Sequence, residues 1–322
     1  MLIDNSAANE FRTCPLLYFE NRIAEGTGLE PKSQINEVTP LGLGSRIHEL
    51  LEEHYQNGRP GLNKVALYPP SPNDALENEA DIIMSAYKAK YPVEEFEIVD
   101  VERTFKVQLP ELCPRCYSKD TREDRLFMVQ DVDTYSCKSC IHSWKPRRHI
   151  YTGKIDVVFR ETGYVMYHPK LSIMDHKSEK RRSNSNHPKK WAATDQASLY
   201  LWAASRIYPG EEIGNFYVNI LKRPSDKLQE GPIFPDRQRL ERTQEQIDIA
   251  VRDIVFIADE IERYKSIFGK GLWPANRQAC SINGWDCSFY LPHTYGWSEE
   301  IRQQKFQAKT PYLKLGDVDI IQ

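Results

Sequence analysis

The chain has 322 residues, 28% of them charged, with a formal net charge of −3 at pH 7 and a mean hydropathy of −0.61. Its length allows one large domain or two modest ones with a buried core, and its charge excludes a general attraction to nucleic acid, so any such binding needs local basic patches. Its apolar runs are too short to span a membrane, and its N-terminal residues lack the basic and apolar regions of a signal peptide. We therefore expect a soluble, cytoplasmic protein without a membrane partner.

The first third of the chain is predicted to be largely helical. Its predicted elements are helices over residues 6–24, 41–56 and 73–91 and a strand over residues 96–109. The first helix contains Cys14. In the second helix, Leu43, Ile47 and Leu51 recur at helical spacing and predict a buried stripe. His48 lies on the same helix after two glycines, and a lone histidine on a helix is more often structural or solvent-facing than functional.

Residues 110–146 interrupt this pattern with two Cys-x2-Cys pairs, Cys113 with Cys116 and Cys137 with Cys140. The chain has seven cysteines, an odd number, and no export signal is recognisable, so metal ligation is favoured over disulfide bonds. The spacing of the pairs lies at the edge of the zinc-ribbon range. Redox-active pairs are the alternative, but two pairs within one short polar insertion favour zinc.

The insertion also carries residue types that bind DNA. Tyr117, Tyr135 and Trp144 are suited to stacking on bases, and residues 145–148, Lys-Pro-Arg-Arg, are suited to contacting phosphates. Aromatic side chains also cover the small core of a zinc ribbon. A contact between the ribbon and DNA is therefore a hypothesis at this point.

Two short strand-like runs follow, residues 154–159 and 171–177, and each places one acid among apolar residues. A carboxylate in an apolar strand is costly to desolvate unless a cation or a donor compensates it. Lys177 lies two residues after Asp175, so both side chains face the same way. Together with Asp156, these groups at a sheet edge can hold a divalent metal against a phosphate. The alternative is a hairpin with a buried ion pair between Asp175 and Lys177.

The connection between these two strands decides whether their acids meet. A tight turn at residues 162–163 would place Asp156 opposite Pro169 rather than opposite Asp175. The two acids can face each other only if the residues between the strands form a longer loop or a bulge. Pro169 favours such an irregularity.

A basic segment follows the second acidic strand. Residues 178–191 hold one acid, Glu179, and five bases: Lys180, Arg181, Arg182, Lys189 and Lys190. Such runs are mostly solvated loops, but the position of this one beside the candidate metal site favours binding of a phosphate backbone. The remaining predicted elements are helices over residues 191–208 and 243–268 and a strand over residues 215–221. Gln196 and Tyr200 lie on one face of the first of these helices.

Several of these motifs occur in the order of a known pattern. They are Cys-Pro-Leu-Leu-Tyr from Cys14, His48, Gly-Lys-Ile-Asp ending at Asp156, Asp-His-Lys at 175–177, and Gln196-x3-Tyr200. Together they resemble the PD-(D/E)XK nuclease superfamily, in the RecB/AddB-type exonuclease branch that includes CRISPR-adaptation nucleases and phage iron–sulfur exonucleases. The resemblance covers residues 11–293 apart from the insertion. It implies an α/β fold with a restriction-endonuclease-like core, a mixed central sheet flanked by helices, into which the zinc ribbon is inserted.

The resemblance implies roles for the motif residues. The implied ligands of Mg²⁺ or Mn²⁺ are His48, Asp156, Asp175 and the backbone carbonyl of His176. Carboxylates and a carbonyl suit both metals, and the neutral imidazole shifts the preference toward Mn²⁺. Lys177 is implied to orient the attacking water and to offset charge on the phosphate. Gln196 and Tyr200 are implied to line the face that binds the nucleic-acid strand.

The same branch often carries an iron–sulfur cluster held by one N-terminal and three C-terminal cysteines. Cys14, Cys280 and Cys287 match three of these positions, and His293 stands where the last cysteine is expected. A [4Fe–4S] cluster is the expectation from the resemblance. Three thiolates and one imidazole also describe a structural zinc site. Three unligated cysteines in a core are the remaining alternative.

The predicted organisation has four segments: an N-terminal helical part with the first core strand (1–109), the zinc-ribbon insertion (110–146), the nuclease core (147–270) and a C-terminal metal-binding segment with the tail (271–322). The expected function is metal-dependent cleavage of DNA by a single-strand exonuclease in recombination, repair or phage replication. A helicase or recombination protein is the expected partner. The expected location is the cytoplasm, or the cytoplasm of the host if the protein is encoded by a phage. Two alternatives stay open: a non-catalytic nucleic-acid-binding zinc-ribbon protein, and an endonuclease or end-processing subunit of a larger complex.

Overall fold

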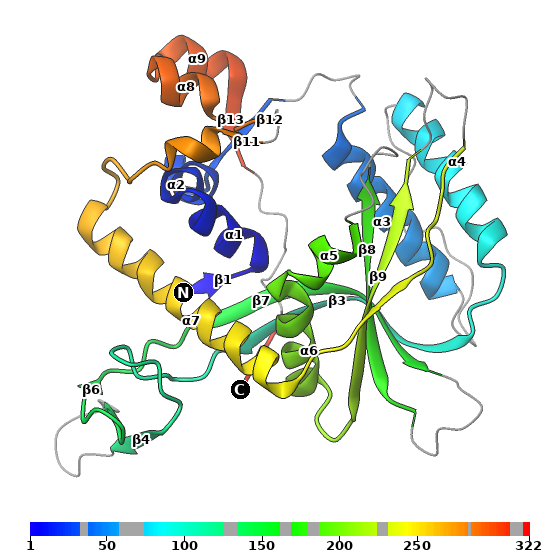
Figure 1. Cartoon of the computed structure of the whole chain (residues 1–322). Helices are drawn as coiled ribbons and strands as arrows, with labels where there is room; N and C mark the ends of the chain where they lie inside the picture. The colour runs from blue at the N-terminus through cyan, green and yellow to red at the C-terminus, as the bar shows by residue number, and fades with distance from the viewer. Residues whose placement is uncertain are drawn as a thin grey trace. The chain divides into compact units, whose positions relative to one another are not determined.

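The computed structural model describes residues 1–32, 38–57, 74–124, 134–161, 169–179, 187–223, 231–282, 285–309 and 318–322 (Figure 1). The chain forms two compact units, each assembled from separated stretches: unit 1 from residues 1–32, 105–153 and 248–322, and unit 2 from residues 33–104 and 154–247. Two long strands, β3 (Phe96–Gln108) and β7 (Ile150–Glu161), begin in one unit and continue along the chain into the other.

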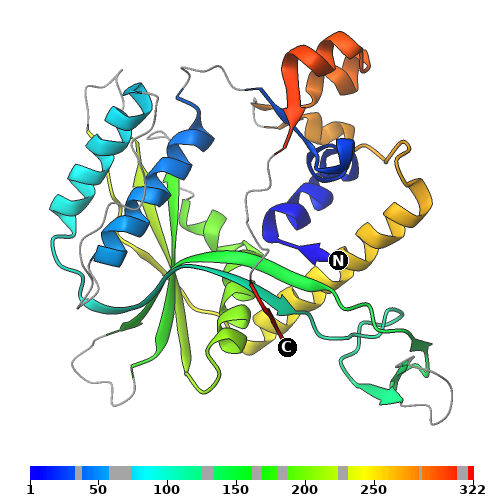
Figure 2. The same ribbon diagram turned by 180° about the vertical axis from the view of Figure 1, so that it is seen from behind.

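Unit 2 is a mixed sheet with helices on both faces. Its helices are α3 (Pro40–Asn57), α4 (Asp74–Lys90), α5 (His187–Ala192) and α6 (Asp195–Ile207), and its further strands are β8 (Leu171–Glu179), β9 (Ile213–Lys222) and β10 (Gln238–Leu240). The strand order is β10-β9-β8-β7-β3, with β9 parallel to β8 and antiparallel to β10, and β8 antiparallel to β7. Helices α3 and α4 cover one face of the strands and α6 covers the other (Figure 1 and Figure 2). This confirms the predicted mixed sheet flanked by helices.

The predicted apolar stripe of α3 forms the centre of the core of unit 2. Leu43, Ile47 and Leu51 are buried and pack in one cluster with residues of α4 and of the sheet. Burying such a side chain contributes about 1.5–3 kcal/mol each, which secures the helix on the sheet. At Gly44 a Cβ atom would lie 3.2 Å from the hydroxyl of Ser178, so the helix passes close to the end of β8. This close approach brings the next turn of α3 toward the acidic strands.

The prediction of one continuous helix over residues 6–24 is wrong at Cys14, where the structure has two helices. Helix α1 (Asn5–Thr13) is capped by the side chain of Asp4, and α2 (Pro15–Arg22) begins directly after Cys14. The backbone of Cys14 is extended (φ −163°, ψ 115°). The cause is Pro15, because a proline ring disfavours the helical conformation of the residue before it and suits the first position of a helix.

The helix predicted over residues 191–208 begins only at Asp195. Thr194 before it is extended (φ −85°, ψ 143°), and its hydroxyl donates to the carbonyl of Trp191 at 3.0 Å. Trp191 belongs to the separate short helix α5. Most of the predicted basic segment lies outside the described residues: Lys180, Arg181 and Arg182 entirely, and Lys189 in its side chain.

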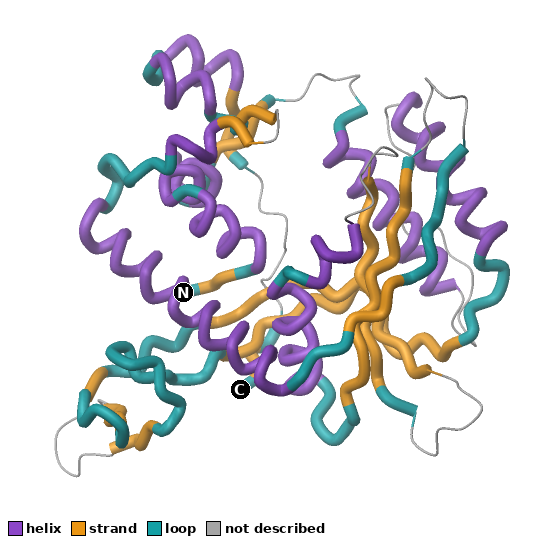
Figure 3. The backbone as a smooth tube through the Cα atoms, viewed as in Figure 1, coloured by secondary structure: helices purple, strands orange, loops and turns teal. Residues whose placement is uncertain are grey.

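Unit 1 combines helices with several small sheets (Figure 3). Besides α1 and α2 it contains β1 (Leu2–Ile3), the 3-10 helix η1 (Ala24–Gly26), β2 (Leu29–Pro31), β4 (Thr121–Asp124), β5 (Thr134–Cys137), β6 (Ser143–Trp144), α7 (Gln244–Phe268, within unit 1 from Asp248), the 3-10 helix η3 (Arg277–Cys280), β11 (Ser281–Ile282), β12 (Trp285–Asp286), α8 (Tyr290–Tyr295), α9 (Glu299–Lys305), β13 (Phe306–Ala308) and β14 (Ile320–Ile321). In the part of the chain that the structure describes, no helix is long and apolar enough to cross a lipid bilayer.

The N- and C-terminal stretches of unit 1 are joined by strand pairing and by a small core. Strand β13 pairs antiparallel with β2, and β11 pairs with β12. Strand β1 pairs in parallel with the start of β7, and β14 with the end of β3. Ala24, Leu29, Phe289 and Phe306 form the buried cluster beneath β2 and β13. Residues far apart in the sequence are thus held together within this unit.

Candidate active site and metal centres

Asp156 and Asp175 lie where the pairing of β7 with β8 ends. The last pair of the register is Val157 with Met174, and each acid is the next residue beyond it. Both are buried, with 5% and 3% of their surface exposed. The backbone N–H of His176 donates to Oδ2 of Asp156 at 2.6 Å and ties the two strands together there. The register therefore brings Asp156 beside Asp175 and His176 rather than opposite Pro169; residues 162–168, which connect the strands, lie outside the described part.

His48 and Glu102 join Asp156 in one cluster. Nδ1 of His48 lies 3.5 Å from Oδ2 of Asp156 and 3.8 Å from Oε1 of Glu102. One ligand atom from each residue lies within 4.8 Å of the others. The Nδ1 atom is buried and makes no hydrogen bond with any described residue. Two carboxylates and an imidazole nitrogen, so spaced, fit a single hard divalent cation. Lys154 forms an ion pair with Glu102.

Asp175 has a different set of partners. Its Oδ2 pairs with the ammonium of Lys177 at 2.7 Å, and its Oδ1 accepts a hydrogen bond from Nε2 of Gln196 at 3.0 Å. The structure therefore brings Gln196 of α6 to the acidic strands. Tyr200, one turn later, is 8% exposed, with its ring centroid 6.2 Å from that of Phe216 in β9. It lies between α6 and the sheet.

The charges of the site shift the pKa values of its members in opposite directions. Burial favours neutral Asp156, but the adjacent His48 outweighs burial and holds the pKa of Asp156 well below its usual value. Burial also disfavours the charged form of His48, yet the carboxylates of Asp156 and Glu102 raise its pKa well above the usual value. Burial raises the pKa of Asp175 to about 6, against the lowering effect of Lys177. The two acids are thus buried beside His48 and Lys177, whose positive charges offset theirs.

The side chain of His176 lies beside this cluster in the core of unit 2, with its ring centroid 6.2 Å from that of His48. Its ring stacks on that of Tyr55 with centroids 5.5 Å apart, and its Nδ1 lies 2.8 Å from Nδ2 of Asn219. Asn219 also donates to the hydroxyl of Tyr87 at 2.9 Å. Burial lowers the pKa of His176 to about 3, so the ring is neutral near pH 7. Its backbone, rather than its ring, faces Asp156.

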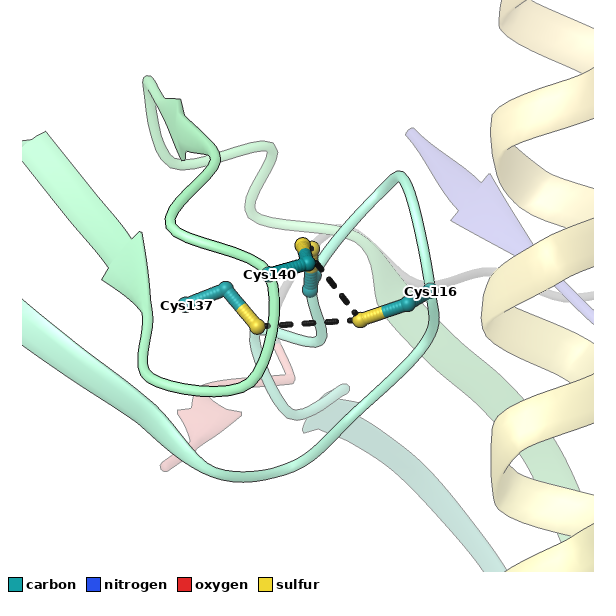
Figure 4. Close-up of side chains that lie close together, drawn as sticks. Cys116, Cys137 and Cys140 are labelled. Atoms are coloured by element: carbon teal, nitrogen blue, oxygen red, sulfur yellow. Dashed lines mark hydrogen bonds between the residues drawn. The ribbon is translucent and has the colours of Figure 1, made fainter.

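The four cysteines of the insertion form a second candidate metal centre. Figure 4 labels three of them, Cys116, Cys137 and Cys140. The sulfur of Cys113 lies 3.5 Å from that of Cys140, and the sulfur of Cys116 lies 3.6 Å from those of Cys137 and Cys140. A tetrahedral zinc with metal–sulfur bonds of about 2.3 Å would place its sulfurs about 3.8 Å apart. The sulfurs therefore fit one zinc ion, as the spacing of the two pairs predicted.

The two Cys-x2-Cys pairs fold in the same way. After the first pair, the N–H of Tyr117 donates to the carbonyl of Cys113 at 2.7 Å; after the second, the N–H of Ile141 donates to the carbonyl of Cys137 at 2.9 Å. Both residues have left-handed backbones, with φ of 54° and 59°. Such a conformation is uncommon for these residue types and persists only where the surroundings impose it.

Two of the residues considered for DNA contact, Tyr117 and Arg147, hold this insertion to α7. The ring of Tyr117 packs edge-on against that of Phe256, and its hydroxyl donates to Asp259 at 3.1 Å. Arg147 forms an ion pair with the same Asp259. Tyr135 and Trp144 stack on each other within the insertion, with centroids 6.0 Å apart.

The remaining cysteines gather in unit 1 without forming a tight cluster. The sulfur of Cys14 accepts a hydrogen bond from the N–H of Asn276 at 3.3 Å. The N–H of Cys287 donates to the carbonyl of Cys280 at 2.8 Å. Burial, with Cys280 and Cys14 nearby, raises the pKa of Cys287. Among the described residues these sulfurs do not come within 4.8 Å of one another as a group of three.

His293 lies in the same unit, and its side chain contacts a carboxylate. Its side chain is 4% exposed, and its Nε2 lies 3.7 Å from Oε1 of Glu20. That oxygen also accepts a hydrogen bond from the indole of Trp297 at 3.1 Å. Glu20 was not expected to be buried, because it lies in a short helix with polar neighbours and its partners are more than 270 residues away in the sequence.

Sequence reasoning also missed Glu102 and left Lys154 without a role. Glu102 lies in a strand where acids alternate with apolar residues, a pattern typical of a solvent-facing position. Its burial depends on His48 and Lys154, each about fifty residues away, and no local signal marks it. Lys154 is part of the Gly-Lys-Ile-Asp motif itself, so the motif was the available signal.

Comparison with known proteins agrees with this geometry. The sequence profile of the PD-(D/E)XK nuclease superfamily matches residues 5–281. A search of curated proteins finds no match. The matched stretch contains α3 with His48, both acidic strands, Lys177 and α6 with Gln196. Since the match spans most of the chain, the protein belongs to the PD-(D/E)XK nuclease superfamily.

Proposed function

We propose that this protein is a metal-dependent DNA nuclease, a phosphodiester hydrolase that degrades single strands from their ends. The observation that carries the proposal is the buried cluster of His48 and Asp156, beside the Asp175–Lys177 pair, in a chain of a nuclease superfamily. The family accounts for the nuclease chemistry. The preference for ends and for single-stranded DNA comes from the resemblance of the motifs to the exonuclease branch.

The residues of the site are suited to this reaction. We assign the binding of Mg²⁺ or Mn²⁺ to a set of four: His48, Asp156, Asp175 and the backbone carbonyl of His176. A divalent cation bound there supplies Lewis-acid activation of water and neutralises phosphate charge. Lys177 can donate a hydrogen bond to the attacking water or to a phosphate oxygen. Gln196 fixes the orientation of the Asp175 carboxylate through its hydrogen bond, and Tyr200 anchors the same helix against β9.

The hydrolysis itself requires few groups. The oxygen of water bonds to phosphorus, the ester bond to the leaving nucleoside breaks, and the leaving oxygen takes up a proton. Positive charge near the phosphate stabilises the transition state, since negative charge accumulates on its oxygens. Lys177 supplies such a charge, and Asp175 keeps it beside the acids of β7 and β8 through their contact.

We further propose two structural metal centres. The ribbon cysteines Cys113, Cys116, Cys137 and Cys140 would hold zinc, which their sulfur spacing supports. Cys14, Cys280 and Cys287 would hold a [4Fe–4S] cluster, completed by His293 or by an exogenous group. Because His293 faces Glu20, an exogenous group is the better supported of the two. Zinc at this second site is the alternative.

The proposed cellular role rests on the resemblance of the motifs to the exonuclease branch. We propose that the protein acts in the cytoplasm, in recombination, repair or phage replication, on DNA ends supplied by a helicase or a recombination protein. The four segments predicted from the sequence, with boundaries at residues 109/110, 146/147 and 270/271, stay predictions.

The test uses one labelled linear and one circular single-stranded DNA, each incubated with Mg²⁺, with Mn²⁺ and with a chelator. We expect metal-dependent loss of the linear substrate and an intact circle. Asp175→Asn and Lys177→Ala are expected to lower the rate by roughly 10²–10³-fold, the typical cost of removing one transition-state contact. Glu211→Gln is the matched control, because Glu211 is an acid of the same unit that pairs with Arg160.

Each outcome separates the alternatives. Cleavage of the circle would replace the exonuclease with an endonuclease. Binding of DNA without any metal-dependent cleavage would favour a non-catalytic binding protein. Wild-type rates in both site variants would refute the assignment of the site.

A further inference from the structure

Glu102 is an acid without an assigned role that lies inside the candidate active site. Its Oε1 is 3.8 Å from Nδ1 of His48, and that nitrogen is 3.5 Å from Oδ2 of Asp156. Its Oε2 pairs with the ammonium of Lys154. The side chain of Glu102 is 6% exposed. Two strands and one helix thus bring three candidate ligands to one point, and Glu102 is the contribution of β3.

The backbone of Glu102 is held in an unfavourable conformation. Its φ is +52°, in the left-handed region that favours glycine, although the residue lies within β3. A glutamate in this region is strained, and such strain is retained where the surroundings impose it, commonly at functional sites. The left-handed turn breaks the regular alternation of the strand. It therefore explains how an acid expected on the solvent face is buried beside His48.

The two oxygens of Glu102 face different neighbours. Lys154 neutralises Oε2, whereas Oε1 faces the imidazole nitrogen that makes no hydrogen bond with any described residue. A buried polar atom that makes no hydrogen bond is costly. The cost is removed if one cation binds that nitrogen and the carboxylate oxygens around it. The observed spacing of these atoms, within 4.8 Å, fits such a shared ion.

We propose that Glu102 is a further ligand of the divalent cation and that Lys154 is a positioning residue that keeps its carboxylate aimed at the site. The inference rests on the proposed function, since it concerns the same metal site. The ligand class is a hard divalent cation, Mg²⁺ or Mn²⁺, because the donors are two carboxylates and one imidazole.

The test measures binding of Mn²⁺ directly, without DNA and without turnover. The full chain, with its ribbon zinc retained and other divalent ions removed, is titrated with Mn²⁺ by calorimetry and by the electron-spin signal of free Mn²⁺. Glu102→Gln is expected to weaken binding by roughly 10–100-fold or more. Mutating a residue that only hydrogen-bonds a metal ligand typically costs that much affinity, and losing a ligand should cost at least as much. Lys154→Met is expected to weaken it less, and Asp156→Asn serves as the positive control.

Two further variants separate a ligand from a structural acid. Glycine adopts φ of +52° without strain, so Glu102→Gly should leave the thermal unfolding temperature unchanged or raise it. A loss of Mn²⁺ affinity in this variant is then due to the missing carboxylate. In the double variant Glu102→Gln with Lys154→Met, a ligand role predicts that the loss persists. A return to wild-type affinity would mean that Glu102 only neutralises Lys154 and would overturn the proposal.

The inference and the proposed function fail in different ways. If Glu102→Gln binds Mn²⁺ as tightly as the wild type while Asp156→Asn does not, Glu102 is not a ligand and the proposed nuclease site stands. If the wild type itself binds no Mn²⁺, both are refuted.

Discussion

Asp259 is one of the acids through which α7 holds the cysteine-rich insertion, and its removal has a predictable cost. It accepts hydrogen bonds from the hydroxyl of Tyr117 at 3.1 Å and pairs with Nε2 of His149 at 2.9 Å and with the guanidinium of Arg147. The side chains of Asp259 and Arg147 are 14% and 17% exposed. The substitution Asp259→Ala therefore removes three contacts at once and leaves Tyr117, Arg147 and His149 buried or partly buried without this partner.

The size of the effect follows from these contacts. A neutral hydrogen bond contributes about 1 kcal/mol and one to a charged group about 1.5–3 kcal/mol, and the contributions are not additive. Arg147 keeps a second partner, the carbonyl of Leu112, which limits the loss. We expect the free energy of unfolding to fall by about 2–4 kcal/mol, a large part of the 5–15 kcal/mol typical of a folded protein.

Urea unfolding followed by circular dichroism measures this loss. Asp253→Ala is the matched control: it lies on the same helix, gains the same helix propensity, and its side chain is 43% exposed. The control is expected to change stability by less than about 0.5 kcal/mol. If Asp259→Ala differs from Asp253→Ala by no more than that, the insertion is not held by this acid.

Two further outcomes are expected. Metal analysis after anaerobic purification should give one equivalent of zinc, from the ribbon, together with iron and sulfide. Two equivalents of zinc without iron would make both cysteine sets zinc sites. One equivalent of zinc without iron would leave Cys14, Cys280 and Cys287 without a metal. Because burial lowers the pKa of His176 to about 3, the folded side chain stays neutral, whereas the unfolded side chain takes up a proton below about pH 6.5. The free energy of unfolding therefore falls as the pH drops from about 6.5 toward 3. In metal-free protein, His176→Gln should reduce the loss of stability between pH 6.5 and pH 4.5 by about 2 kcal/mol in urea titrations, and an unchanged loss would contradict this account.

Long periodic patterns predicted the elements that build the site. The stripe of Leu43, Ile47 and Leu51 predicted α3, because residues at this spacing lie on one face and must be covered. The short apolar runs around Asp156 and Asp175 predicted β7 and β8, because a short continuous apolar run is typical of a strand covered on both faces, as these two are. The acids were noticed because they break those runs.

The elements that sequence reasoning misplaced depend on single residues or on distant partners. The break at Cys14 had a local signal, Pro15, whose effect on the preceding residue outweighs the surrounding helical pattern. Glu102 had none, because its left-handed backbone and its burial are imposed by the packing of β3 against other elements. Tyr117 has a residue type that suits DNA binding and helix docking equally, so composition alone did not distinguish the two.

The second cysteine set raises the question of what holds the two ends of unit 1 together. A metal on Cys14, Cys280 and Cys287 would join them, but it would not act as a disulfide does, because the metal leaves when the chain unfolds and the unfolded ensemble is not constrained. Its stabilising effect would grow with the free metal concentration, as for any ligand that binds only the folded state. The pairing of β13 with β2 and the bond from Trp297 to Glu20 join the same stretches without a metal. Loss of the metal should therefore lower the stability of this unit by the metal's binding free energy alone, and the pairing of β2 with β13 should survive it.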